Sequence, residues 1–173
     1  MSALQSLENN LEDVFVKKAP ALPENGKKMI VEWLPWITVA RGVLSGWLAY
    51  TIWDWGHRLN QFVDYLNTIS ASYGDEVADS RLTPLLWLSV GILALQAVLY
   101  ILAFPALKAR KKSGWDLMFY AFLANAVYGV VVLFTDYGDF GNLLGSLIGS
   151  VVGLYFLFQI RGQYLKAPAA KKV

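Results

Sequence analysis

Arg41 is the side chain whose type and place in this sequence most suggest chemistry, because it lies inside a long apolar segment. An ionisable residue within a membrane span often belongs to a pathway for an ion or a solute. Counted from the basic end of each apolar segment at about 1.5 Å per residue, Gln96, Asn125 and Ser150 fall at a similar depth. The four residues therefore predict a polar layer that would hold an ion or a polar solute. In the alternative, the guanidinium reaches back to the lipid headgroups and its role is structural.

Glycines four residues apart form the second pattern. Such glycines lie on one helix face, and in lipid the groove they leave lets another backbone approach closely. The spacing predicts helix packing, either between the fourth and first apolar segments of one chain or between two copies of the chain. The glycines in this pattern are Gly141, Gly145, Gly149 and Gly153, with a shorter version at Gly42 and Gly46.

Two weaker groupings lie at the ends of apolar segments. Asp54 and His57 are close enough in sequence to form an acid–base pair, although a lone histidine at a membrane interface is commonly a surface residue. Asp136, Asp139 and Asn142 offer oxygen ligands to a cation. Solvation of a loop, or capping of the helix that follows, explains the same three residues more simply.

Several classes of site are excluded by what the sequence lacks. It has no cysteine and a single histidine, so thiolate sites, disulfides and multi-histidine metal centres are not expected. Neither a phosphate-binding glycine loop nor the HExxH or GxSxG motif occurs. The basic clusters flank apolar segments and are explained by topology, so nucleic-acid binding is not supported. We expect no cofactor, no bound metal and no enzymatic activity.

The elements that must position these residues are long apolar blocks. Of the 173 residues, 56% are hydrophobic and 16% charged, against roughly 25% charged in soluble domains. Each block is long enough to cross a hydrocarbon core of roughly 30 Å. The composition thus predicts an all-α polytopic membrane protein, a bundle of four transmembrane helices. The expected spans are residues 30–53, 82–104, 115–135 and 141–160.

Basic residues gather on one side of the expected bundle. They precede the first span, separate the second from the third and follow the fourth, whereas the other two loops are mainly acidic. By the positive-inside rule, both termini are then cytoplasmic, in a plasma (inner) membrane. The basic residues are Lys17, Lys18, Lys27, Lys28, Lys108, Arg110, Lys111, Lys112, Arg161, Lys166, Lys171 and Lys172.

The remaining segments are shorter. Leu4, Leu7 and Leu11 recur at helical spacing and predict an amphipathic N-terminal helix with an acidic polar face, suited to a protein contact. Residues 1–28 would form this helix and a linker, 29–160 the transmembrane domain and 161–173 a basic tail. Helical spacing from Leu59 to Ile69 indicates either an extension of the first span or a helix on the outer surface.

These patterns favour a non-enzymatic assembly or accessory component of a membrane. Its partners would be the lipid bilayer and either a second copy of the chain or another membrane protein. The alternative is a small transporter or channel that uses the polar layer around Arg41. A third possibility, a membrane enzyme, would require Asp54 and His57 to converge in a cleft at the outer face.

Overall fold

The computed structural model describes residues 3–72, 84–133 and 140–165. Helices account for 93% of these described residues, and none of them lies in a strand. The expectation of an all-α protein is therefore confirmed. The helices are α1 (Ala3–Glu12), the π-helical turn η1 (Asp13–Lys18), α2 (Glu24–Ala71), α3 (Pro84–Lys108), α4 (Lys112–Leu133), α5 (Phe140–Gln159) and α6 (Arg161–Leu165).

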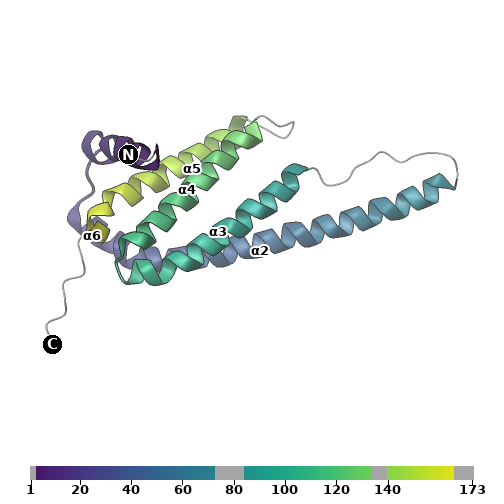
Figure 1. The fold of residues 1–173 in the computed structure, drawn as a ribbon, viewed down its shortest axis with the longest axis horizontal. Coiled ribbons are helices and arrows are strands. Elements are labelled where there is room, and N and C mark those ends of the chain that lie inside the picture. Colours follow the sequence, from purple (N-terminus) through teal and green to yellow (C-terminus); the bar gives the residue numbers. More distant parts are fainter. Residues whose placement is uncertain (1–2, 73–83, 134–139, 166–173) are drawn as a thin grey trace.

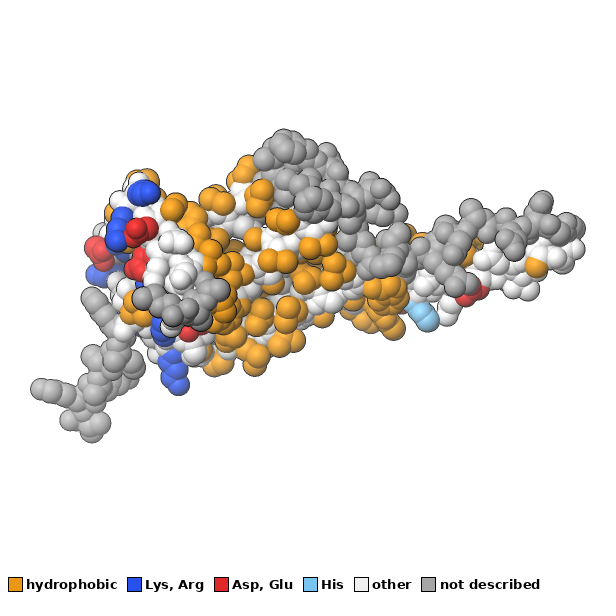
Figure 2. Space-filling view, turned by 45° about the horizontal axis from the view of Figure 1, so that its top comes forward, with side chains coloured by type: hydrophobic (Ala, Val, Ile, Leu, Met, Phe, Trp, Pro, Cys, Tyr) orange, Lys and Arg blue, Asp and Glu red, His pale blue; other side chains and the backbone are white. Residues whose placement is uncertain are grey.

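The long helices form a row in chain order. α2 packs on α3, α3 on α4 and α4 on α5, while α1 and η1 lie beside α5 (Figure 1). α1, α6, the start of α2 and the turn between α3 and α4 all lie at one end of this row (Figure 1). We call this the charged end, because acidic and basic side chains gather there in Figure 2.

Two helices within the described residues are long and apolar enough to cross a membrane. They are the segments Leu86–Lys108 of α3 and Lys112–Val132 of α4. Leu147–Gln159 of α5 is a shorter apolar segment, and α2 does not pass the same test. By length and composition alone, the structure thus supports two of the four expected spans.

α2 departs most from the sequence expectation, which ended the first span at residue 53 and began it no earlier than residue 30. It is one continuous helix of 48 residues, about 72 Å long, and its second half projects beyond the other helices (Figure 1). Pro23 precedes its first residue, Glu24, inside the expected linker. Pro35, a possible start of the span, lies within the helix. Of the two interpretations of residues 59–69, the structure has the extension of the first span.

The buried residues of α2 follow a heptad pattern. They are spaced by three, four or seven residues along the whole helix, which is the period of helices packed at a shallow crossing angle. Between residues 38 and 49 the buried side chains are all small, so α3 can approach the α2 backbone closely. The buried residues are Val31, Pro35, Thr38, Gly42, Ser45, Ala49, Gly56 and Val63.

The exposed face of α2 is the more apolar one. Val43, Trp47 and Tyr50 are each more than 60% exposed, whereas Ser45 and Ala49, between them in sequence, are 6% exposed. This reverses the pattern of a helix in a water-soluble protein, which buries its large apolar residues.

A tight turn joins α3 to α4 at the charged end. Lys111 N donates to Ala106 O at 2.9 Å and Arg110 N to Leu107 O at 2.9 Å, the two bonds of a Schellman motif. Arg110 has φ 51°, in the left-handed region that glycine usually occupies. At Gly114, an added Cβ would lie 2.5 Å from the Leu107 backbone nitrogen. The turn therefore depends on a glycine at position 114 and tolerates strain at Arg110.

The main hydrophobic core also lies at the charged end. Trp115 is fully buried, its indole Nε1 donates to Leu157 O at 2.8 Å, and its ring meets Phe158 edge-on at 5.2 Å. Phe119 stacks on Trp115 at 5.5 Å, so three aromatic rings from α4 and α5 interlock. Tyr100 of α3 and Phe15 of η1 belong to the same core. This cluster joins α3, α4, α5 and the N-terminal segment.

Candidate functional site

The predicted glycine face of α5 (Gly141, Gly145, Gly149 and Gly153) is partly exposed and partly packed against another helix. Gly145 and Gly149 are exposed, and a Cβ added at either would meet nothing within 4 Å. At Gly153, in contrast, an added Cβ would lie 2.3 Å from the Phe122 ring of α4. Gly141 falls in the first turn of α5, and its surroundings lie outside the described residues. Among the described residues, therefore, part of the predicted packing face has no partner.

The glycines of α2 pack against α3 rather than α5. A Cβ at Gly42 would lie 3.1 Å from Ile101 Cγ1 and 3.2 Å from Tyr100 Cβ, and one at Gly46 would lie 3.6 Å from Ala97 Cβ. The proposed pairing of the fourth span with the first is thus replaced by a pairing of the first with the second. The sequence pattern identified glycines suited to packing but not their neighbours.

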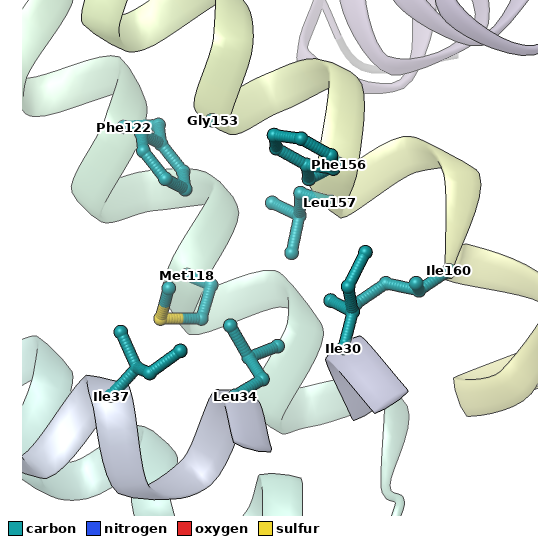
Figure 3. A pocket seen from close by; sticks show the side chains of 9 residues that line it. All are labelled: Ile30, Leu34, Ile37, Met118, Phe122, Gly153, Phe156, Leu157 and Ile160. Carbon is teal, nitrogen blue, oxygen red and sulfur yellow. The ribbon is translucent and has the colours of Figure 1, made fainter. Parts of the chain in front are cut away.

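An apolar pocket of about 240 Å³ lies between α2 and α5. Ile30, Leu34 and Ile37 of α2 point across it toward Phe156 and Leu157 of α5, with α4 behind them (Figure 3). Almost all of its lining is hydrocarbon, so it has no group to orient a polar substrate.

Three of the four predicted polar-layer residues form one hydrogen-bonded chain. Gln96 Nε2 of α3 donates to Asn125 Oδ1 of α4 at 3.3 Å, and Asn125 Nδ2 donates to Ser150 Oγ of α5 at 3.1 Å. Gln96 and Ser150 are buried, with 4% and 3% exposure. A neutral chain of this kind links three helices without the cost of burying a charge.

A cavity of about 330 Å³ lies beside this chain, between α2, α3 and α4. Gln96 and Asn125 line it together with Ser89 and Tyr128, whose hydroxyl oxygens are 2.6 Å apart. Sequence reasoning missed Ser89 and Tyr128. Helical spacing alone could have indicated them. Ser89 lies two turns from Gln96 on α3 and Tyr128 one turn from Asn125 on α4, both away from the charged end.

Arg41 does not join the layer. It is exposed, and its guanidinium carbon lies 5.4 Å from the centroid of the Tyr100 ring of α3. Tyr100 is one helical turn closer to the charged end than Gln96. This cation–π contact and the exposed position fit the structural alternative, in which the side chain leans toward the headgroups.

Asp54 and His57, considered as an acid–base pair at the outer end, each contact other side chains instead. Asp54 Oδ2 accepts a hydrogen bond from Arg58 Nε at 3.0 Å, and His57 Nε2 lies 3.1 Å from Gln61 Nε2. The His57 ring stacks on Trp53 at 5.7 Å. Asp136, Asp139 and the Asn142 side chain lie outside the described residues, and no cluster that could hold a metal ion occurs among the residues described.

A second polar site joins the N-terminal segment to the end of α5, and sequence reasoning did not identify it. Gln159 Nε2 donates to Phe15 O at 2.7 Å, and Gln159 Oε1 accepts from Leu22 N at 3.2 Å. Tyr155 Oη donates to Pro20 O at 2.7 Å. The Phe15 ring stacks on Phe158 at 5.9 Å. Residues 15–22 are thus held against α5 by side chains more than 130 positions away in sequence.

Arg161 completes this contact. Its guanidinium forms ion pairs with Glu8 and Glu12 of α1 and lies over the Trp115 ring, 5.4 Å from the centroid. The acidic face of the N-terminal helix, expected to meet a separate protein, therefore binds its own chain. Nearby, burial raises the pKa of Tyr164 to about 12, against an opposing effect of Arg110.

Comparisons with known proteins add no family to this description: no family model matches the chain, and no curated protein or solved structure matches it. The sites above are therefore interpreted from their own geometry.

Proposed function

We propose that this chain is a small integral membrane protein with four spans, formed by α2, α3, α4 and α5. The reversed burial of α2, with large apolar side chains outward and small ones inward, supports its place in lipid. On α5, Ile148 and Val151 are at least half exposed, which supports the same environment. In Figure 2 a broad apolar surface covers the middle of the visible face, next to the charged end. On the positive-inside argument, the charged end is cytoplasmic, in the plasma (inner) membrane.

Within that membrane the protein acts as a non-enzymatic assembly component. The observation that supports this proposal is the open pair Gly145 and Gly149, where an added Cβ would meet no described residue within 4 Å. Helices associate in lipid through close backbone packing, because burying apolar side chains brings no gain there. A glycine groove open to lipid is thus a surface suited to a second helix.

A second copy of the same chain is the occupant we propose. Two α5 helices related by a twofold axis would place the same groove on both sides of the contact, so the surface is complementary to itself. The exposed neighbours Ile148 and Val152 would flank the seam and fill the space that the glycines leave. Among the described glycines of α5, Gly153 is the one whose added Cβ would meet another helix of the chain, at Phe122.

The test is the oligomeric state of the purified chain in mild detergent and in nanodiscs, by light scattering and subunit counting. The double variant Gly145→Leu, Gly149→Leu is expected to convert dimers to monomers, because leucine side chains hold the two backbones apart. Val151→Leu is the matched control on another exposed part of α5 and should leave dimers intact. A monomeric wild-type protein, or dimers unaffected by the double variant, would refute the proposal.

A small transporter or channel is the second candidate, favoured by the cavity beside Gln96 and Asn125. Arg41 has no part in it, since it lies outside the cavity lining. The absence of native cysteine allows a direct test with Ser89→Cys and membrane-impermeant thiol reagents. Modification from both sides of a sealed vesicle would support a conducting path. Protection from both sides would refute it.

A further inference from the structure

The cavity beside the polar chain has the features of a binding site for a small ligand. Its volume of about 330 Å³ is at the lower end of the range for such sites, roughly 300–1,000 Å³. Most of its wall is apolar, with a few polar groups from α3 and α4 at its floor. This combination of an apolar wall and few convergent polar groups is typical of sites that orient an amphiphile.

One polar group in the cavity lining, the side-chain amide of Gln96, can accept a further hydrogen bond. Among the interactions of the described residues, the Gln96 side chain makes one hydrogen bond, which uses its Nε2. Its carbonyl oxygen Oε1 has no hydrogen-bond partner among the described residues, and the residue, which is 4% exposed, lines the cavity. An amide oxygen at the wall of a largely apolar cavity gains from a hydrogen-bond donor, and a ligand hydroxyl would supply one.

The absence of charged side chains from the cavity lining indicates that the ligand is uncharged. All four polar residues (Ser89, Gln96, Asn125 and Tyr128) are neutral, and Arg41 is not part of the lining. An ionised ligand would lose its hydration there without gaining a countercharge, which is unfavourable in a low-dielectric site. A neutral ligand loses much less.

The wall formed by α2 indicates how such a ligand would enter. Ile52 and Trp55 line the cavity, and Trp55 is 56% exposed on the surface of the bundle. The cavity is therefore bordered by a side chain that also faces the proposed lipid. An indole ring at this border offers an apolar face to a hydrocarbon chain.

From these observations we propose that the cavity binds a neutral membrane-soluble amphiphile whose head carries a hydroxyl group. The hydroxyl donates to Gln96 Oε1, and the hydrocarbon body lies against Ile52 and Trp55 between α2 and α3. This site is independent of the open glycines on α5, so it can be correct whether or not the protein dimerises.

The experiment uses the full chain in phosphatidylcholine nanodiscs with a long-chain alcohol that carries a photoactivatable diazirine. Its methyl ether, which cannot donate a hydrogen bond, and the corresponding carboxylate serve as comparison probes. After illumination, the labelled residues are located by mass spectrometry. We expect the alcohol to label the cavity lining about threefold to tenfold more than the ether does, as the loss of one hydrogen bond implies.

Two variants test the site from different helices. Gln96→Leu removes the acceptor, and Ile52→Trp fills the cavity from α2 without touching the polar chain. Both are expected to lower labelling by the alcohol to the level of the ether. Val98→Leu, on the exposed face of α3, is the matched control and should leave labelling unchanged. The Ile52→Trp variant keeps the test valid if Gln96→Leu does not fold.

Three outcomes would overturn the proposal. They are equal labelling by alcohol and ether, stronger labelling by the carboxylate, and alcohol labelling that persists in Ile52→Trp. Oligomeric state is measured on the same samples. Dimers that lose labelling in Ile52→Trp would separate the ligand site from the assembly function.

Discussion

The charged end and the opposite end of the bundle are built on different principles. At the charged end, Trp115, Phe158 and Phe15 interlock, and Arg161 and Gln159 tie the N-terminal segment to α5. Toward the other end the helices hold a mainly apolar cavity with a few polar groups, α5 exposes two glycines, and α2 continues alone. Stability is thus concentrated where the N-terminal segment packs on the end of α5, and the open surfaces lie toward the other end of the described helices. This division is common in proteins whose binding regions need freedom to adapt.

The largest expected contrast between the ends comes from two tryptophans. Trp115→Ala removes a fully buried ring and its hydrogen bond to Leu157, and we expect it to lower the free energy of unfolding by about 3–5 kcal/mol. Trp47→Ala removes a side chain that is 61% exposed and should cost about 0.5 kcal/mol or less. Unfolding in mixed detergent micelles measures both. Similar losses from the two variants would contradict the division.

Two arginines sharpen the same comparison. Arg161→Gln leaves Glu8 and Glu12 without their cation in a site that is largely shielded, and the contact should weaken by about 1.5–3 kcal/mol. Backbone amides of α1 are then expected to exchange hydrogen faster. Arg58→Gln breaks the exposed pair with Asp54 on the projecting half of α2, where an effect below about 1 kcal/mol is expected. Unchanged exchange in Arg161→Gln would show that aromatic packing alone holds the segment.

A pair of glycines gives a smaller contrast. Gly114→Ala places a Cβ against the Leu107 backbone, which has no flexible part to move, so a loss of about 1–3 kcal/mol is expected. Gly149→Ala enters open space and should be neutral, or stabilise by up to about 1 kcal/mol through helix propensity. Thermal unfolding of both variants in the same detergent measures the two changes in stability. A destabilised Gly149→Ala monomer would mean that its face is occupied within the chain.

The smallest effect is expected at the turn itself. Arg110 has a positive φ, so Arg110→Gly should relieve strain and stabilise the protein by about 0.5–1 kcal/mol. The adjacent Lys111→Gly serves as the control: it relieves no such strain and should destabilise slightly, through the entropy of the unfolded chain. Thermal unfolding of the two variants gives the sign of each effect. A destabilised Arg110→Gly would show that the arginine side chain contributes more than its backbone costs.

Hydropathy predicted α3, α4 and α5 to within a few residues, because long apolar blocks between basic clusters have few alternative structures. It did not predict the length of α2. Residues 54–71 are too polar to be read as a span, yet no proline interrupts them and the heptad period continues through Gly56 and Val63. The structure also carries α3 past Pro105 to Lys108, where the predicted span had ended at residue 104.

Residue counting predicted the depth of the site residues along the helices, but not the direction of their side chains. Counting residues placed Gln96, Asn125 and Ser150 at one level, and the structure joins them in a hydrogen-bonded chain. Counting does not give the direction in which a side chain points, so Arg41 was assigned to the layer although it is exposed and not part of the cavity lining. The pairing of Arg161 with Glu8 and Glu12 spans about 150 residues, and no local pattern indicates such a contact.

The uninterrupted course of α2 gives the molecule a mechanical property. A single helix resists bending and twisting over its length far better than two helices joined by a loop. A force on its projecting half would therefore be transmitted along the helix to the part that packs against α3. Gly42, whose added Cβ would lie 3.4 Å from Ala97 O, marks a point of close approach between the two helices. The same helix carries Ile52 and Trp55, so its packed part and one wall of the cavity belong to a single continuous element.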